Sequence, residues 1–165
     1  MGVDIHMNIV KDNKIILPNI FEGRNSDWFC NLQGSGWDYE YDHLPEYTGI
    51  PDKCPEEIKD DFKKPAGAGY YGFHYMIVKE FKRWYEKYRP DLKAGWASTY
   101  DKWRIEKKHY VPECGLPQYL NEEDNKEDMH FVEYVDYYEC SRWLYKYLKE
   151  KNIPDDAYIS YYFDR

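Results

Sequence analysis

Asp4 and His6 are the first residues of the chain whose types and spacing could support chemistry at one site. They lie in residues 3–10, where apolar and polar side chains alternate with the period of two that is typical of a strand with one buried face. Side chains two residues apart on a strand project from the same face, so this carboxylate and this imidazole can reach one ligand. His6 alone could also act as a general base near neutral pH. A simpler interpretation stays open, in which both residues only form the solvent-exposed side of a half-buried strand.

A second polar group follows at a glycine turn. Asn25 or Ser26 could cap a short helix that begins near Asp27. Arg24 would then lie beside the backbone N–H groups at the start of that helix, an arrangement that suits an anion. In the structural alternative, Arg24 pairs with Asp27 or Asp4 and ties the loop to the sheet.

Tyrosine and tryptophan dominate the apolar content, with 19 Tyr and 6 Trp among 165 residues. The core must therefore be largely aromatic, and any exposed ring is a stacking platform for a flat ligand such as a nucleobase. We predict one ligand site that combines these rings with the polar groups. Its candidate residues are Asp4, His6, Arg24, Asn25, Asp27, Trp28, Trp37, Tyr71, His74 and Asp164, with Tyr70 as a further stacking ring.

The net charge of −8 argues against binding of long nucleic acids, which needs a basic surface. It is compatible with a small nucleotide held by one or two arginines. No apolar run is long enough to span a bilayer, and Asp4 and His6 interrupt any signal peptide, so we expect a cytoplasmic protein without a membrane partner. The four cysteines are scattered without a C-x-x-C pair, which disfavours a zinc site or a disulfide framework. We expect no cofactor.

The elements that must position these residues indicate an α+β fold. Residues 157–164 also alternate, so we predict that strands at both ends of the chain pair in a small, mainly antiparallel sheet, with about three helices packed on its apolar face. The other face would carry Asp4, His6, Ser160, Tyr162 and Asp164, and would be either solvent-exposed or a site.

Helices are predicted over residues 75–88, over a segment with Gly95 near its start, and over residues 137–151, with a shorter one over 55–62. The first of these has an apolar stripe made of Ile77, Phe81, Trp84, Tyr85 and Tyr88. Residues 131–135 fit either a strand or a helix. By its length the chain is a single domain, 1–165.

Several segments resemble a family of small uncharacterised proteins, many encoded by bacteriophages, that open M-G-C-D-I-H. Those proteins continue with a G-R-N-Y-D-L-F segment, a G-L-P loop, an H-S-x-S-[WY]-L-T-L-x-E-L helix start and a last strand similar to V-F-W-F-D-N. Here the matching segments are residues 1–6 (M-G-V-D-I-H), 23–29 (G-R-N-S-D-W-F), 49–51 (G-I-P), 75–81 and 161–164 (Y-Y-F-D). Val3 replaces the cysteine, and Tyr71 and His74 replace the first histidine and second serine of the H-S-x-S segment.

The resemblance implies an accessory protein that binds host factors or immune signals, and the acidity and aromatic content are similar to those of phage proteins that sequester nucleotide second messengers. Our leading hypothesis is a protein that binds such a small nucleotide without turning it over, as a homodimer or higher homo-oligomer.

Two alternatives stay open. One is an enzyme, a metal-dependent phosphoesterase in which Asp4, His6, Asp27 and Asp164 hold a divalent ion. Since no Ser or Cys nucleophile stands at a recognisable elbow and no H-x-H pair, H-D dyad or repeated H-x-[ST] motif is present, we lean against catalysis. The other alternative is an acidic inhibitor that binds a host protein through residues 38–42 and 122–128.

Overall fold

The computed structural model describes residues 3–21, 24–34, 41–64 and 70–164, and it divides into two compact units. Unit 1 combines residues 1–88 with 145–165, and unit 2 comprises residues 89–144. Each unit is described by itself below. The expectation that the whole chain folds as one domain stays a prediction, because a division of contacts does not measure cooperative unfolding.

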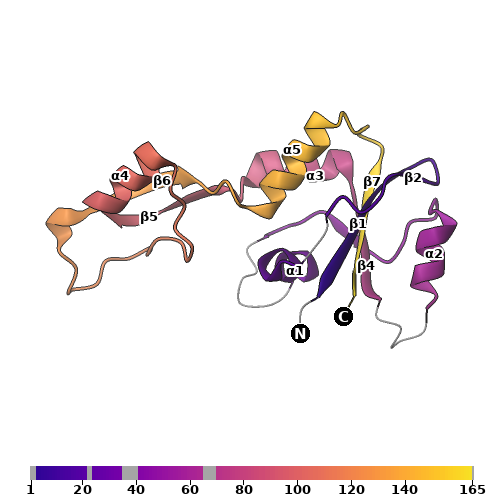
Figure 1. Ribbon diagram of the computed structural model, residues 1–165, viewed down its shortest axis with the longest axis horizontal. Coiled ribbons are helices and arrows are strands. Elements are labelled where there is room, and N and C mark those ends of the chain that lie inside the picture. Colours follow the sequence, from indigo (N-terminus) through magenta and orange to yellow (C-terminus); the bar gives the residue numbers. More distant parts are fainter. Residues whose placement is uncertain (1–2, 22–23, 35–40, 65–69, 165) are drawn as a thin grey trace. The chain divides into compact units, whose positions relative to one another are not determined.

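Unit 1 is built on a five-stranded antiparallel sheet with the strand order β2-β1-β7-β4-β3 (Figure 1). Its elements are β1 (Asp4–Lys11), β2 (Lys14–Leu17), α1 (Ser26–Gln33), β3 (Glu46–Thr48), α2 (Glu56–Phe62), β4 (Tyr71–Ile77), α3 (Val78–Tyr88), the last residues of α5 (Cys140–Glu150) and β7 (Tyr158–Asp164). The terminal strands are direct neighbours, from Asp4 opposite Asp164 to Val10 opposite Tyr158. The α+β class and the pairing of both terminal strands are therefore confirmed.

The alternation in β1 and β7 creates one fully apolar face. Its residues are Ile5, Met7, Ile9, Ile159, Tyr161 and Phe163, all of them buried. Helices α1, α3 and α5 lie on this side of the sheet, and α2 lies on the other (Figure 1). From α1, the ring of Phe29 meets the ring of Phe163 edge-on, with centroids 4.8 Å apart. The expectation of about three helices on the apolar face is confirmed, with α1 in place of the helix expected near Gly95. Helix α2 forms a third layer on the other face (Figure 1).

Helix α2 covers part of the face that was predicted to be solvent-exposed or a site. Ile58 of α2 packs with Val10 and Tyr158 in one buried cluster. Ser160 and Tyr162 are also buried. This stretch of the second face is thus interior because α2 covers it, and both faces of β7 are buried.

Helix α3 begins at Val78, three residues later than predicted. Tyr75 and Ile77 belong to β4 and pair with Ser160 and Tyr158 of β7, so the tertiary pairing overrides the helical pattern there. From Val78 onward, three of the four predicted stripe residues are buried. Phe81, Trp84 and Tyr85 are buried, whereas Tyr88 at the end of the helix is exposed.

Unit 2 contains β5 (Leu92–Ser98), α4 (Thr99–Lys108), the 3-10 turn η1 (Lys126–Asp128), β6 (Met129–Val135) and the first residues of α5. Strands β5 and β6 form a two-stranded antiparallel sheet, which resolves the ambiguity of residues 131–135 in favour of a strand. The prediction of a helix starting near Gly95 is wrong. Gly95 lies within β5, and α4 starts only after Ser98, whose hydroxyl accepts a hydrogen bond from the Asp101 N–H.

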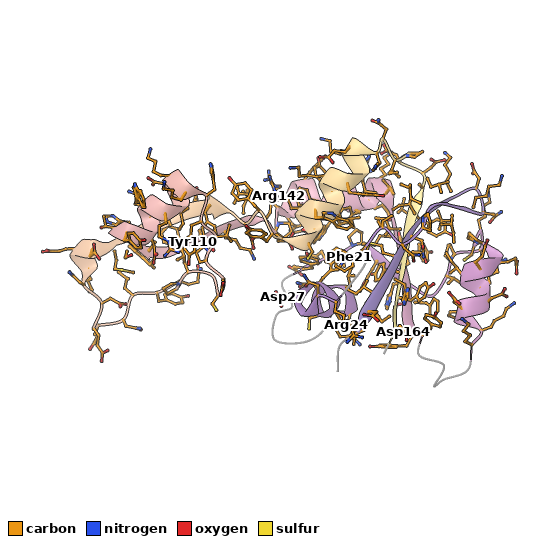
Figure 2. The ribbon with its side chains drawn as sticks, in the orientation of Figure 1. Phe21, Arg24, Asp27, Tyr110, Arg142 and Asp164 are labelled. Carbon is orange, nitrogen blue, oxygen red and sulfur yellow. The ribbon has the colours of Figure 1, made fainter. Side chains whose placement is uncertain are left out.

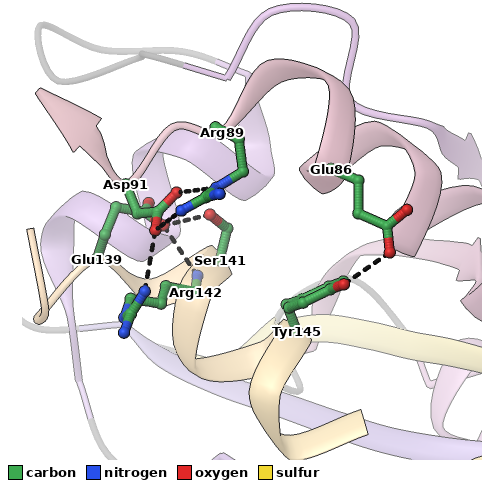
Figure 3. Close-up of polar contacts among 7 residues, drawn as sticks. All are labelled: Glu86, Arg89, Asp91, Glu139, Ser141, Arg142 and Tyr145. Carbon is green, nitrogen blue, oxygen red and sulfur yellow. Dashed lines mark hydrogen bonds and ion pairs between the residues drawn. The ribbon is translucent and has the colours of Figure 1, made fainter. Parts of the chain in front are cut away.

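A buried carboxylate joins the first strand of unit 2 to the start of α5 (Figure 3). Asp91 accepts two hydrogen bonds from Arg89, at 2.9 and 3.0 Å, and one from Nη1 of Arg142 at 3.1 Å. Glu139 accepts from the Ser141 hydroxyl and from the Arg142 N–H, which caps α5. Because a lone buried charge is costly, the two guanidinium groups are what makes this position of Asp91 tolerable.

No helix in the described part of the chain is long and apolar enough to cross a membrane.

Candidate functional site

Asp4, His6 and Asp164 come together where β1 begins and β7 ends. Asp4 lies directly opposite Asp164 and His6 directly opposite Tyr162, so all four residues share one face of the sheet. Nε2 of His6 is 3.7 Å from Oδ2 of Asp164. The predicted convergence of these three polar residues is present in the structure.

Arg24 is paired with Asp4 through a hydrogen bond of 2.7 Å from Nε to Oδ1. This hydrogen bond holds the pKa of the Asp4 carboxyl below its usual value and raises the pKa of Arg24. The ion pair with Asp4 that the structural interpretation of Arg24 requires is therefore present. Both side chains remain substantially exposed, at 60% for Arg24 and 45% for Asp4, so part of the Arg24 side chain is accessible to solvent. Figure 2 shows Arg24 and Asp164 at the same end of the sheet.

Aromatic rings enclose the imidazole of His6. The ring of Tyr162 is stacked on it, with centroids 5.2 Å apart and planes 15° apart, and the ring of Tyr70 meets it edge-on at 5.4 Å. The Nε2 atom of His6 is buried and has no hydrogen-bond partner among the described residues. A buried polar atom without a partner is unusual and indicates either strain or a group supplied from outside.

Helix α2 supplies a carboxylate and a cation that were not predicted as site residues. Asp61 accepts hydrogen bonds from the Tyr162 hydroxyl at 2.7 Å and from Nζ of Lys64 at 2.8 Å. Burial alone would raise the pKa of Asp61, but the hydrogen bonds from Lys64 and Tyr162 outweigh it, and the pKa is lowered. The ammonium group of Lys64 also lies 4.4 Å from the centre of the Tyr70 ring, which is a cation–π contact.

We call this group, made of His6, Asp61, Lys64, Tyr70, Tyr162 and Asp164, the His6 cluster. In the sequence, the only signal for Asp61 and Lys64 was an acid and a base three residues apart, which is common on helix surfaces. Their proximity to His6 depends on where α2 packs against the sheet.

Asn25 and Trp28 have structural roles in α1. The Asn25 side chain accepts a hydrogen bond from the Trp28 N–H at 2.8 Å, so Asn25 is the N-cap, as one of the two capping alternatives predicted. The Trp28 ring is buried and packs on Phe21 and Tyr41. The expectation that Trp28 stacks on a ligand is therefore wrong. Asp27 lies in the first turn of α1 with its side chain exposed.

Tyr71 and His74 lie on the apolar face of the sheet, opposite to the His6 cluster. The Tyr71 ring packs on Phe163, with centroids 5.7 Å apart, and the His74 ring is stacked on Tyr161 at 5.6 Å. An irregularity in the β4–β7 pairing between Tyr71 and His74, with Gly72 at a φ of 65°, changes which side chains face each side. The prediction that these two residues join Asp4 and His6 in one site is wrong. Trp37 lies outside the described residues.

Within the described ranges, no group of three or more histidine, cysteine, aspartate or glutamate side chains is arranged to hold a metal ion. The set proposed for a divalent ion, Asp4, His6, Asp27 and Asp164, is therefore not assembled as a cage there. One of its members, Asp4, instead accepts a hydrogen bond from Arg24.

Searches of protein-family models, of curated proteins and of solved structures find no match to this chain. The resemblance in the opening and loop segments thus stays an expectation, and any function must be argued from the site itself.

Proposed function

We propose that this chain binds a small nucleotide at the His6 cluster and sequesters it without turning it over. The observation that carries the proposal is the buried Nε2 atom of His6, which lacks a hydrogen-bond partner among the described residues. A base edge or a phosphate oxygen placed against it would satisfy this atom, and a ring nitrogen of histidine can serve as donor or acceptor.

Two cations, Lys64 within the cluster and Arg24 beside it, are exposed enough to meet an anion. Lys64 is 43% exposed, and Arg24 is exposed to a greater extent. Each already has a carboxylate partner, so a phosphate would compete with Asp61 or Asp4 or share the cation with it. Charge-assisted hydrogen bonds to phosphate are among the stronger polar contacts, which supports this role.

Of the rings predicted to stack on a base, Tyr70 is the one that lies in the His6 cluster. Its ring contacts both His6 and Tyr162 edge-on, while its side chain is only half-buried. An aromatic ring beside a cation is a suitable platform for a flat base. In the class implied by the resemblance, such a binding protein would withdraw a host signal by holding it.

A nucleotide panel tests the proposal. We would measure the unfolding midpoint with cyclic and linear nucleotides, with and without Mg²⁺, since a ligand that binds only the native state raises the midpoint by mass action. The ligand is then recovered after heat denaturation. Intact nucleotide supports sequestration, whereas a hydrolysed product would overturn it in favour of the phosphoesterase alternative.

Two substitutions test where the ligand binds. Lys64→Ala should weaken binding by about 10- to 100-fold through loss of a charge-assisted contact. Its matched control is Lys63→Ala, which removes the same charge from the exposed neighbouring position. His6→Phe keeps a flat ring beside Tyr162 but removes Nε2, and should also weaken binding. Equal losses for Lys63→Ala and Lys64→Ala, or no response to any nucleotide, would contradict the proposed site.

A further inference from the structure

The two edges of the sheet in unit 2 differ. On the outer side of β5, the Trp96 N–H donates to the Pro117 carbonyl at 2.8 Å, and Nε2 of Gln118 donates to the Ala94 carbonyl at 2.7 Å. A Cβ at Gly95 would lie 2.5 Å from the Cβ of Leu116, so the segment that follows Gly115 lies tightly against β5. The edge formed by β5 is therefore already covered.

The backbone groups of β6 can be oriented from these contacts. Trp96 lies opposite Phe131, and Ala94 lies opposite Glu133. In an antiparallel pair, directly opposed residues are either both hydrogen-bonded to each other or both directed outward. Since Trp96 and Ala94 direct their backbone groups outward, Phe131 and Glu133 do so as well, on the other edge.

This outer edge of β6 is open in the part of the chain that the structure describes. There, β5 is the only strand paired with β6, and no backbone hydrogen bond joins the outward groups of Phe131 or Glu133. The strand contains no lysine or proline, and its register with β5 runs without a bulge. Folded proteins commonly block exposed edges with such features, because an open edge pairs with another strand.

The two exposed side chains of β6 are an aromatic ring and a carboxylate. Phe131 is 53% exposed, and its ring meets the Trp96 ring edge-on with centroids 5.5 Å apart. Glu133 carries the single carboxylate of β6. The edge thus offers both unpaired backbone groups and an exposed aromatic ring.

We propose that β6 pairs antiparallel with β6 of a second copy of this chain, with Phe131 opposite Phe131 of the partner subunit. The result is a continuous four-stranded sheet in the order β5-β6-β6-β5. This interface goes beyond the proposed nucleotide site and does not depend on it.

Side-chain pairing selects this register. Centring the pair on Glu133 would oppose two carboxylates, and centring it on Val132 would oppose Phe131 to a carboxylate. Centring it on Phe131 opposes two aromatic rings and sets Glu133 against the partner subunit's Met129, which favours this arrangement because cross-strand aromatic pairs stabilise a sheet and like charges destabilise it.

Cysteine cross-linking tests the register directly, in a background in which the exposed Cys114 is replaced by serine. The Cα atoms of a directly opposed hydrogen-bonded pair are about 5.5 Å apart, which is within the range of a disulfide. Phe131→Cys should therefore form a disulfide-linked dimer on oxidation. Glu133→Cys is the matched control, because its two copies would lie about 13 Å apart along the strands. Cross-linking of Glu133→Cys but not of Phe131→Cys would overturn the register.

Sedimentation velocity tests the dimer without cross-links. The unmodified chain should sediment with twice the mass of one chain at high concentration and dissociate on dilution. Glu133→Pro removes an outward N–H without removing a bond of the β5–β6 ladder, and by symmetry it deletes two hydrogen bonds of the dimer, so it should weaken the dimer by about tenfold or more. Glu133→Ala keeps that N–H and should leave the dimer intact. A chain that is monomeric at every concentration, or a dimer that Glu133→Pro leaves unchanged, would overturn the proposal.

Discussion

Tyr162 lies with its ring parallel to the imidazole of His6, at a centroid distance of 5.2 Å, and its hydroxyl donates to Asp61 of α2. One side chain of β7 therefore links the first strand to the helix that covers the second face of the sheet. This link defines the orientation of His6 and places Asp61 and Lys64 beside it. A residue read from the sequence as part of a polar or exposed face is in fact a buried connection between two layers.

The charged hydrogen bonds of Asp61 should contribute to stability at neutral pH. We expect Asp61→Asn to lower the free energy of unfolding by roughly 1–2 kcal/mol at pH 7, because the bonds from Lys64 and Tyr162 lose their ionised acceptor. Urea denaturation measures the difference. The control is Asp60→Asn, at the exposed neighbouring position, which should have little effect.

The same pair of variants should show a defined pH dependence. The pKa of Asp61 is lower in the folded protein than its usual 3.8, so the stability it contributes is fully present above that value and is lost as the pH falls through the folded pKa. The difference between the unmodified chain and Asp61→Asn should therefore shrink when denaturation is repeated at about pH 3 or below. A difference of the same size at both pH values would show that Asp61 contributes through packing instead.

Trp84 of α3 should contribute more to the stability of the fold than Trp103 of α4. Its ring is 5% exposed and packs against Tyr41 and Phe81, and its Nε1 donates to the Asp42 carbonyl at 2.7 Å. Trp84→Ala should reduce the free energy of unfolding by about 3–5 kcal/mol through the cavity it leaves. Trp103→Ala, at a ring that is 46% exposed, should change it by less than about 1 kcal/mol. Comparable effects in guanidinium denaturation would contradict the assignment of α3 to the core.

Gly72 should not tolerate a side chain. Its φ is 65°, and a Cβ there would lie 2.6 Å from Cδ2 of Phe163. Gly72→Ala should destabilise the protein by about 2–4 kcal/mol, since it adds backbone strain to a steric clash in the core. Gly49→Ala separates the two causes, because Gly49 also has a positive φ, of 91°, but has no atom within 4 Å of a Cβ. If thermal denaturation shows equal losses, the clash with Phe163 contributes nothing.

Much of the fold follows from local patterns. The alternation in β1 and β7 predicts two strands with Ile5 and Ile159 on one buried face, and the register confirms it. The capping preference of Asn25 predicts the start of α1, which the hydrogen bond from the Trp28 N–H confirms. These signals are readable because the repeat of a strand and the orphan N–H groups of a helix are properties of the backbone within a few residues.

The composition of the site depends on contacts between segments far apart in the chain. Asp61 and Lys64 lie near His6 only because α2 packs on the second face of the sheet. The Trp28 ring is part of the core, where it packs on Tyr41 and Phe21. A single irregularity at Gly72 is enough to direct Tyr71 and His74 to the opposite face. Periodicity within a strand predicts which side chains share a face. Which segments cover that face depends on the burial of apolar area across the whole unit, and no local sequence pattern encodes this choice of neighbours.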